Sequence, residues 1–435
     1  MKKILFIIGA LDSGGVAKSI VNLLNAIDRE KQEVHLLVMG AGEGPFAQYI
    51  PEEVFIHRNP ITAWLLAGFG GVWQLLKHGH LLLALGSLLR MALSKIDKPS
   101  AAWLLAQMFP ELPVSSSKVT PVSSFKTCTS ESYNLQPETT VPLQPETSEA
   151  LQPETSEALK PETSTIPPLW DVIVDYNGQQ DLYYMVDKLK GKKKITFFHS
   201  DYHKWPFYER MDRKYFPKVD AICTISEQCV QSLKEVFPEV SDKVKLVPNI
   251  SLPSMIYKLA DEKVEMPPLH GTVLVTVGHV CYNKGVDLII GAAKILKQKG
   301  LDFSWILVGS TVGADEYLSE IRSSELKDYI YPVGIQSNPY AFMKRADIVV
   351  HPSRFEGKSI TLDEAKILCK PIVVTNFSTV RDQFEDGDNA SICEIDDGCL
   401  ADGIERMVMD DRLRVSYIKN LSNNQNNSVC NYVVI

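Results

Sequence analysis

Short runs of β-branched and aliphatic residues alternate with longer helical patterns over most of this chain. The first run, Lys3–Ile8, is followed by an amphipathic segment over 16–27 and by the run EVHLLVM at 33–39. The alternation returns after residue 170 and continues to about residue 376. Strand patterns that alternate with helix patterns predict parallel sheets with helices on both faces. We therefore expect an α/β fold of two Rossmann-like, doubly wound domains that face each other across a cleft.

The expected elements fall into two sets. In the first half we expect strands over 3–8, 33–39, 171–176, 193–199, 221–226 and 243–249, and helices over 16–27 and 227–236. In the second half we expect strands over 272–279, 304–310, 329–334, 346–353 and 371–376, and helices over 286–299, 315–324, 339–345 and 361–368. These sets predict an N-terminal domain of residues 1–113 and 168–255, a C-terminal domain of 256–415, and a tail of 416–435. Ligands of such sheets bind at the carboxyl ends of the strands, so the cleft is the expected site.

An eight-residue repeat interrupts the first set. LQPETTVP, LQPETSEA, LQPETSEA and LKPETSTI follow one another over 135–166. Proline in every unit forbids a continuous helix, and little apolar surface is present to bury. We expect 114–167 to be a disordered insertion. It is either a tolerated tandem expansion without a role or a docking tether.

The stretch 61–93 is strongly apolar but is broken by glycines, histidines, a lysine and an arginine. It contains no run of about 20 uncharged residues, so it does not predict a membrane-spanning helix. We expect two amphipathic helices here. Either they pack into the core, or they form a surface that enters a membrane interface.

Length, charge and cysteine content narrow the class of protein. The 435 residues exceed what one ordinary core contains. The net charge of −8 argues against a general nucleic-acid binder. The eight cysteines form no CxxC pair and no metal spacing, so we interpret them as buried free thiols of a reducing cytosol. The N-terminus reads as a buried strand rather than a signal peptide, which predicts a cytoplasmic protein.

Two glycine-containing loops follow expected strands. Gly14 and Gly15 precede the first helix, where glycine lets the backbone approach a phosphate at the helix N-terminus, although a simple tight turn has the same composition. The loop lacks the GxGxxG spacing, which argues against a dinucleotide dehydrogenase. In the second half, Gly278 and His279 begin a loop that ends in Lys284, whose ammonium stands where a cation could meet a diphosphate.

The stretch HPSRFEGKSITLDEAK at 351–366 holds the most specific chemistry. Glu356 follows a strand, and Glu364 stands in the next helix with Thr361 as its expected N-cap in a capping box. Between them, Gly357, Lys358 and Ser359 form a loop whose amides we expect to be free to bind an anion. A carboxylate beside an anion site is useful if it accepts from hydroxyls. The pattern therefore predicts a ligand that has both phosphates and sugar rings.

These residues resemble a known family. The Glu-seven-Glu element, Lys284-Gly285, the double glycine and Phe198-His199 are similar to the signature of the retaining nucleotide-sugar glycosyltransferases of family four, which have the GT-B fold. Gln336-Ser-Asn-Pro-Tyr340 fits as well. The resemblance covers about residues 1–50 and 169–415.

The resemblance implies a role for each matching position. Glu356, His199 and Lys284 would be catalytic: Glu356 and His199 beside the donor sugar, and Lys284 against the leaving diphosphate. Glu364 would accept from the ribose. The remaining positions implied to bind the nucleotide sugar are Gly14, Gly15, Gly278, His279, Gly309, Gly357, Lys358, Ser359 and Ile360. The resemblance implies no bound metal and no cofactor, since the nucleotide sugar is a co-substrate.

Three positions depart from the family pattern. His279 stands where the family commonly has arginine, which predicts a weaker or pH-dependent diphosphate clamp. Ser359 replaces a second loop glycine, and the stretch Pro248-Asn249-Ile250 lacks the usual glycine after the asparagine.

We expect transfer of a sugar, from UDP rather than GDP because UDP is the commoner donor, to a lipid-linked saccharide or glycan of a surface polysaccharide. The expected place is the cytoplasm at the inner face of the cell membrane, with 61–93 as the membrane contact. The alternatives are a catalytically impaired GT-B protein that serves in assembly, to which the His279 departure lends some support, and a nucleotide-sugar epimerase.

Overall fold

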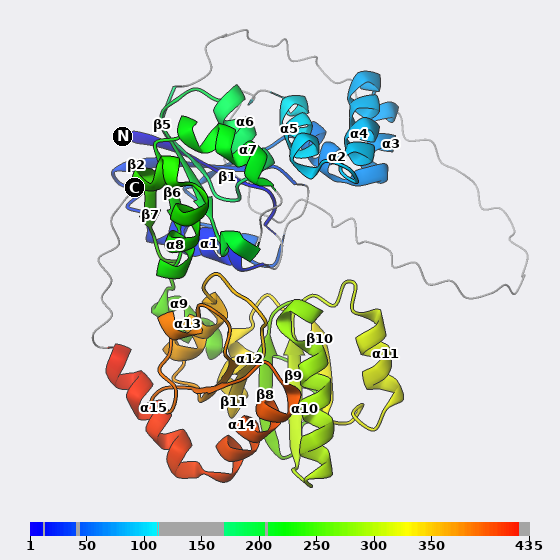
Figure 1. The fold of residues 1–435 in the computed structure, drawn as a ribbon, viewed down its shortest axis with the longest axis vertical. Coiled ribbons are helices and arrows are strands. Elements are labelled where there is room, and N and C mark those ends of the chain that lie inside the picture. The colour runs from blue at the N-terminus through cyan, green and yellow to red at the C-terminus, as the bar shows by residue number, and fades with distance from the viewer. Residues whose placement is uncertain (12–13, 41–43, 111, 113–168, 205–207, 426–435) are drawn as a thin grey trace, which may run out of the picture.

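The computed structural model describes residues 1–11, 14–40, 44–110, 112, 169–204 and 208–425. Over these residues the chain forms a seven-stranded and a six-stranded sheet, which lie in the upper and lower halves of Figure 1. All strand pairs within the two sheets are parallel. The expected α/β class with two doubly wound sheets is therefore confirmed. The repeats at 135–166 lie outside the described residues.

The N-terminal sheet has the order β3-β2-β1-β4-β5-β6-β7. Its strands are β1 Lys2–Ile8, β2 Gln32–Val38, β3 Phe55–Arg58, β4 Trp170–Asp175, β5 Gly191–Phe198, β6 Ala221–Thr224 and β7 Val244–Leu246. The direction of winding reverses between β1 and β4, which pair from Ile4–Val172 to Ile7–Asp175. A reversal of this kind opens a crevice at the carboxyl ends of the two strands.

The C-terminal sheet repeats the plan with the order β10-β9-β8-β11-β12-β13. Its strands are β8 Thr272–Val277, β9 Phe303–Val308, β10 Ile330–Gly334, β11 Ile348–His351, β12 Ile372–Thr375 and β13 Ser391–Cys393. Here the winding reverses between β8 and β11. The edge strands β3 and β13 are not among the expected strands because each is a short run with little hydrophobic alternation.

Helices cover both faces of each sheet, as Figure 1 shows. In the N-terminal half they are α1 Gly15–Ala26, α2 Pro60–Leu66, α3 Gly68–Lys77, α4 Leu81–Leu93, α5 Lys98–Met108, α6 Gln180–Lys188, α7 Glu209–Tyr215 and α8 Glu227–Val236. In the C-terminal half they are α9 Pro253–Ala260, α10 Val286–Gln298, α11 Asp315–Ser323, α12 Tyr340–Arg345, α13 Ile360–Ile367, α14 Asp397–Met409 and α15 Asp411–Gln425.

The apolar stretch 61–93 forms three helices, and the expectation of two was wrong. Asn59 caps α2, and its side chain accepts from the amide of Ile61. The chain then turns through Gly68, whose φ of +61° suits glycine, and starts α3. A second turn at Gly79 separates α3 from α4. These helices and α5 project to one side of the N-terminal sheet, away from the C-terminal half (Figure 1).

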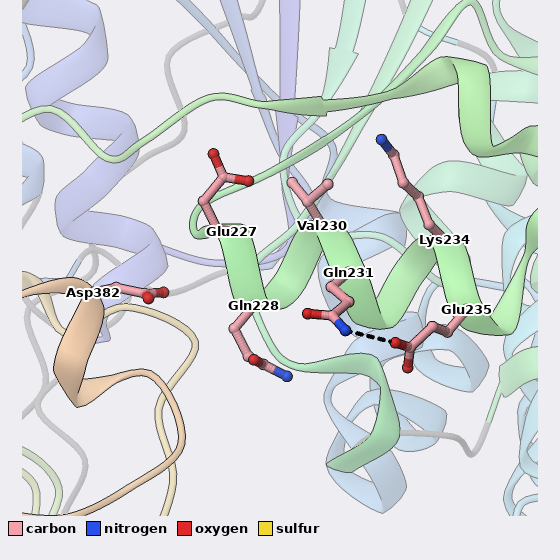
Figure 2. A pocket seen from close by; sticks show the side chains of 7 residues that line it. All are labelled: Glu227, Gln228, Val230, Gln231, Lys234, Glu235 and Asp382. Carbon is pink, nitrogen blue, oxygen red and sulfur yellow. Dashed lines mark hydrogen bonds between the residues drawn. The ribbon is translucent and has the colours of Figure 1, made fainter.

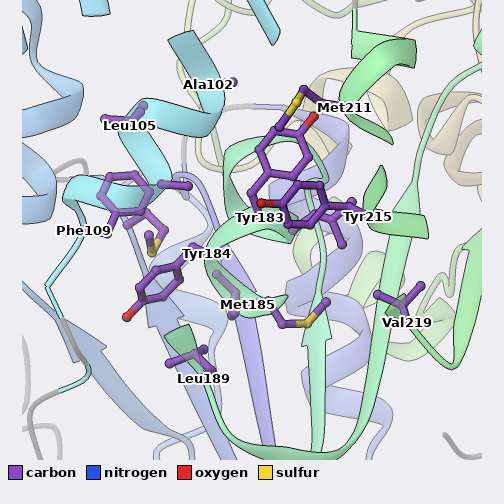
Figure 3. Packing of buried hydrophobic residues seen from close by; sticks show 14 of the residues in the cluster. Ala102, Leu105, Phe109, Tyr183, Tyr184, Met185, Leu189, Met211, Tyr215 and Val219 are labelled. Atoms are coloured by element: carbon purple, nitrogen blue, oxygen red, sulfur yellow. The ribbon is translucent and has the colours of Figure 1, made fainter. Parts of the chain in front are cut away.

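The larger N-terminal core lies between the sheet and α5, α6 and α7. Figure 3 shows Leu105 of α5 and Phe109, the C-cap of that helix, beside Tyr184 of α6. Met211 and Tyr215 of α7 lie on the other side of α6. The rings of Phe109 and Tyr184 meet edge to face at 5.6 Å. This packing joins residues on both sides of the 114–167 insertion, so the insertion leaves the N-terminal core continuous.

The last helices pack on the C-terminal half. Tyr417 and Leu421 of α15 are buried in the two cores of that half, and the Asn420 side chain donates to the Asp388 carbonyl at 2.9 Å. The segment treated above as a tail is therefore helical as far as Gln425. Ile256 and Leu259 of α9 belong to the same half of the molecule.

Candidate active site

The carboxyl ends of the two sheets face each other across a cavity of about 620 Å³. Helices α1 and α8 of the N-terminal half lie opposite α9 and α13 of the C-terminal half (Figure 1). The loops after β1, β5, β8, β9 and β11 all reach this cavity. Among the expected site residues, those that line it are Gly14, Gly15, His199, Gly278, His279, Lys284, Gly309, Glu356, Gly357, Lys358, Ser359 and Ile360. The structure thus brings together residues that are up to 346 positions apart.

A second, more open hollow of about 550 Å³ lies beside α8. Figure 2 shows its lining, which consists of Glu227, Gln228, Val230, Gln231, Lys234, Glu235 and Asp382. Asp382 comes from the short helix η8, Val380–Asp382, of the C-terminal half. The wall has no glycine loop and no aromatic ring, and none of the expected site residues belongs to it. We therefore place the site in the larger cavity.

Glycine is required where the loops of the C-terminal sheet approach each other. A Cβ at Gly309 would lie 1.9 Å from the carbonyl oxygen of Gly278. The amide of Gly278 in turn donates to the Val308 carbonyl at 2.9 Å. These contacts hold the loop after β8 against the loop after β9, so both backbones lie open to the cavity.

Lys284 and Glu356 form an ion pair on the C-terminal wall. Lys284 ends the short helix η7, Tyr282–Lys284, and Glu356 follows β11. The same carboxylate also accepts from Ser353 Oγ at 2.7 Å and contacts His351 Nε2 at 3.0 Å. Burial by itself would raise the pKa of Glu356, but Lys284 and His351 outweigh it and hold this pKa well below its usual value. Glu356 is therefore an ionised acceptor.

Glu364 does not line the cavity. It is fully buried, and its carboxylate lies 2.8 Å from Lys18 Nζ of α1 and accepts from the Tyr340 hydroxyl at 2.8 Å. The capping box expected here was wrong, because α13 begins at Ile360 and Ser359 is its N-cap. The Ser359 hydroxyl accepts from the Leu362 amide. Glu364 is consequently beyond the first turn and free of any capping role.

The loop between the two glutamates touches the opposite half of the molecule. A Cβ on Gly357 would lie 2.4 Å from the backbone oxygen of His199, so only glycine allows this approach. The Ser359 amide donates to Gln383 Oε1 at 3.0 Å, which corrects the expectation that this amide is free for an anion. Lys358 Nζ lies 3.7 Å from the Asp363 carboxylate, and Lys358 remains a cation on the cavity wall.

His199 directly follows the strand β5 and lines the cavity from the N-terminal half. Its Nε2 is buried and makes no hydrogen bond. The rings of Tyr176 and Phe197 pack on the imidazole at 4.8 and 5.6 Å. Burial lowers the pKa of His199 to about 4, so the ring is neutral at physiological pH. A buried nitrogen without a partner is costly unless a ligand satisfies it.

His279 is exposed, and its Nε2 donates to the Val312 carbonyl at 2.9 Å. This bond leaves Nδ1 as the ring nitrogen that is free to meet a ligand. The geometry is compatible with the expected place of His279 beside a diphosphate.

Lys18, Phe46 and Asn249 also line the cavity, and the sequence reasoning missed all three. Lys18 Nζ lies over the rings of Phe46 and Tyr340, at 5.2 and 5.0 Å from their centroids. The one available signal was a lysine on an otherwise apolar helix face, one turn after the double glycine.

Within the described residues, no group of three or more His, Cys, Asp or Glu side chains could hold a metal ion. The same residues include no helix that is both long and apolar enough to cross a membrane. The six cysteines that the structure describes are free thiols.

Residues 260–423 match the family model described as "Glycosyl transferases group 1". The fold matches the crystal structure of Anabaena HepE in complex with UDP-glucose with a TM-score of 0.59, 15% identity, and coverage of 98% of this chain and 95% of that one. The chain therefore has the GT-B fold, and its residues 260–423 resemble the glycosyltransferases of that family model. The resemblance that the sequence indicated is therefore confirmed.

Two curated relatives are similar to parts of this chain. An N-acetylgalactosaminyltransferase from Campylobacter jejuni, named for a diphospho-undecaprenol acceptor, is 27% identical over 46% of this chain and 54% of its own length. The capsular polysaccharide biosynthesis glycosyltransferase CapM from Staphylococcus aureus is 26% identical over 32% of this chain and 37% of its own length. The chain thus spans about half, or less, of the length of these relatives.

Proposed function

We propose that this chain transfers a sugar, with retention of anomeric configuration, from a nucleotide sugar to a lipid-linked saccharide or glycan acceptor in surface polysaccharide biosynthesis. One observation carries the proposal: Lys284 and Glu356 from one half and His199 from the other line the same cavity. These groups suit a ligand that has a diphosphate at one end and hydroxyls at the other. They are a cation, an ionised carboxylate and a buried imidazole nitrogen without a hydrogen-bond partner.

We propose that Lys284 pairs with Glu356 and at the same time contacts the diphosphate of such a ligand. An ammonium has three N–H donors, and the ion pair with Glu356 uses one of them. In our proposal another donor meets the diphosphate and stabilises the charge that develops as the bond from the anomeric carbon to the phosphate oxygen breaks. The acceptor oxygen bonds to that carbon on the same face, and its proton passes to the leaving phosphate. We expect no metal ion to be required, as the family resemblance implies.

The remaining cavity residues complete the donor site in this proposal. Gly15 and the backbone at Gly357 approach the diphosphate, and His199 faces the sugar. Glu364 accepts from the ribose only when it shares its carboxylate with Lys18, because Lys18 holds that carboxylate here. We favour UDP over GDP because UDP is the commoner donor, and because the HepE structure, which has the same fold, contains UDP-glucose.

The acceptor side of the proposal draws on the N-terminal helices. Phe69, Trp73, Leu82 and Leu89 of α3 and α4 are 77%, 68%, 83% and 61% exposed, which is unusual for side chains of this size. The Campylobacter relative is named for a lipid-linked acceptor. We propose that α3 and α4 dip into the cytoplasmic face of the membrane and so bring the cavity close to a lipid-linked saccharide.

The test is a panel of UDP and GDP sugars incubated with the protein, with and without a lipid extract. We expect one donor to be hydrolysed slowly and to be transferred when the extract is present. Glu356→Gln should lower both rates about 100-fold. Glu320→Gln is the matched control, since Glu320 pairs with Lys294 on the surface of the same half.

The alternatives give different results in the same assay. A nucleotide-sugar epimerase would convert the sugar and leave it on the nucleotide. An assembly protein without activity would release no nucleotide and show no thermal shift with any donor. Either result would overturn the proposed transfer.

A further inference from the structure

The two carboxylate oxygens of Glu356 differ in their hydrogen bonds to the surrounding side chains. Oε1 contacts three groups: the ammonium of Lys284, Ser353 Oγ at 2.7 Å and His351 Nε2 at 3.0 Å. Oε2 makes no hydrogen bond with any residue that the structure describes. The Glu356 side chain is 13% exposed and lines the cavity. One oxygen is thus saturated by the protein, and the other is left for a ligand.

Two of the side chains that donate to Oε1 hold the orientation of the Glu356 carboxylate, and they belong to the end of β11 and the turn that follows it. His351 is the last residue of β11 and is 3% exposed, and Ser353 is 1% exposed two residues later. Ser353 Oγ also lies 3.1 Å from His351 Nε2, so the two side chains brace each other. Thr375 of β12 donates to the Ser353 carbonyl at 2.6 Å and ties this turn to the sheet. Both donors therefore stand on rigid parts of the fold.

The tautomer of His351 follows from its surroundings. Its Nδ1 is buried and has no hydrogen-bond partner. A carboxylate oxygen can only accept, so the nitrogen that faces Glu356 carries the hydrogen. His351 is then an Nε2–H donor with a bare Nδ1. A leucine at this position would keep much of the packing and remove the donor.

We propose that His351 and Ser353 are positioning residues that clamp Oε1 of Glu356 and thereby present Oε2 as the acceptor for a hydroxyl of the transferred sugar. The inference rests on the proposed function and deepens it. Lys284 makes the third contact to Oε1. Unlike His351 and Ser353, it also contacts the diphosphate in the proposed mechanism, so it is not a positioning residue alone. The clamp explains why a carboxylate beside a phosphate site stays oriented toward hydroxyl donors. A carboxylate that rotated freely would no longer present Oε2 to the sugar hydroxyl, and a misplacement of about 1 Å can cost about 100-fold in rate.

The first test needs no donor sugar. Long-range ¹H–¹⁵N spectra of the full chain report which imidazole nitrogen carries the proton, and His351→Gln identifies the His351 signals. We expect the neutral ring to be the Nε2–H tautomer, with Nε2 shifted when Ser353→Ala or Glu356→Gln removes a partner. An Nδ1–H form, or an Nε2 signal that ignores Glu356→Gln, would overturn the clamp.

The second test uses the donor identified in the nucleotide-sugar panel. His351→Leu and Ser353→Ala should each lower kcat about 10-fold to 100-fold, while the inhibition constant of the free nucleotide stays within about twofold. His351→Gln and Ser353→Thr keep a donor and should recover most of the rate. Ser391→Ala controls for a loss of packing alone, because Ser391 is a buried serine that accepts from Arg406 and does not line the cavity.

The two tests separate the clamp from the proposed function. If no donor is used, the transferase proposal fails, and the spectra still decide the geometry at Glu356. If the wild type is active and both His351→Leu and Ser353→Ala keep its kcat, the positioning role is wrong although the transferase proposal stands. A lower melting temperature with unchanged kcat would assign the two residues to stability alone.

Discussion

The ammonium of Lys18 lies 2.8 Å from the carboxylate of Glu364, and this ion pair joins the two halves of the molecule. The Lys18 side chain is 8% exposed and that of Glu364 is not exposed at all. Tyr340 donates to the other carboxylate oxygen, so both oxygens are satisfied. Removal of one member of such a pair leaves a buried charge without compensation, which costs far more than the loss of a surface pair.

We predict that Lys18→Met lowers the free energy of unfolding by about 3–5 kcal/mol. Urea unfolding followed by fluorescence measures this free energy. If the two halves unfold in separate steps, each transition is fitted separately. Lys294→Met, which breaks the exposed pair with Glu320, should cost no more than about 1 kcal/mol. The double variant Lys18→Met/Glu364→Gln should recover part of the loss, because no unpaired charge remains. Equal losses for Lys18→Met and Lys294→Met would contradict the prediction.

Gly357→Ala should hold the two halves apart. Its Cβ would meet the His199 carbonyl oxygen at 2.4 Å, and a backbone atom cannot move aside as a side chain can. Overpacking of this kind costs about 1–3 kcal/mol in the closed form. Small-angle X-ray scattering should therefore show a larger radius of gyration than for the wild type. A Cβ at Gly14 meets nothing within 4 Å, so Gly14→Ala should scatter like the wild type; identical curves for all three proteins would refute the steric argument.

The neutral state of His199 makes stability depend on pH. Burial lowers its pKa in the folded protein to about 4, below the ordinary value of 6.5. Between these values the unfolded chain binds the proton first, so stability falls as the pH falls from about 6.5 to 4. The contribution is about 3 kcal/mol at the acid end. Relative to each protein at pH 7.5, unfolding curves at several pH values should show a loss that is about 3 kcal/mol smaller in His199→Gln than in the wild type. Other buried histidines, such as His57, contribute equally to both proteins.

The exposed apolar face of α3 and α4 predicts membrane binding. The wild type should float with vesicles that contain anionic lipid, and the double variant Phe69→Ser/Trp73→Ser should remain in the soluble fraction. Val312→Ser is the control, since Val312 is 78% exposed on the other half of the molecule. Recovery of the wild type in the soluble fraction at low salt would rule out α3 and α4 as a membrane contact.

Much of the fold follows from local pattern. Runs such as 4–8 of β1 and 274–277 of β8 lie in strands because nearly all of their residues are β-branched, aliphatic or aromatic and are buried. The expected helix at 227–236 is found at that position. The apolar stretch 61–93 misled the prediction, because composition shows that helices form but not where glycines divide them. The family resemblance implied that Glu356, Lys284 and His199 act together, and all three line one cavity.

The sequence by itself determined the two parallel sheets, the cleft at their carboxyl ends and some of the residues that line it, because period, glycine position and strand ends are local properties. Only the tertiary structure decided the partners of the two glutamates. Lys18 is 346 residues from Glu364, and no local pattern connects an ammonium on α1 to a carboxylate on α13. The N-cap at Ser359 instead of Thr361 was decided in the same way, since Gln383 of another segment holds the Ser359 backbone. Contacts between distant segments form only when the two sheets are packed, and they satisfy both oxygens of Glu364 while Oε2 of Glu356 is left for a ligand.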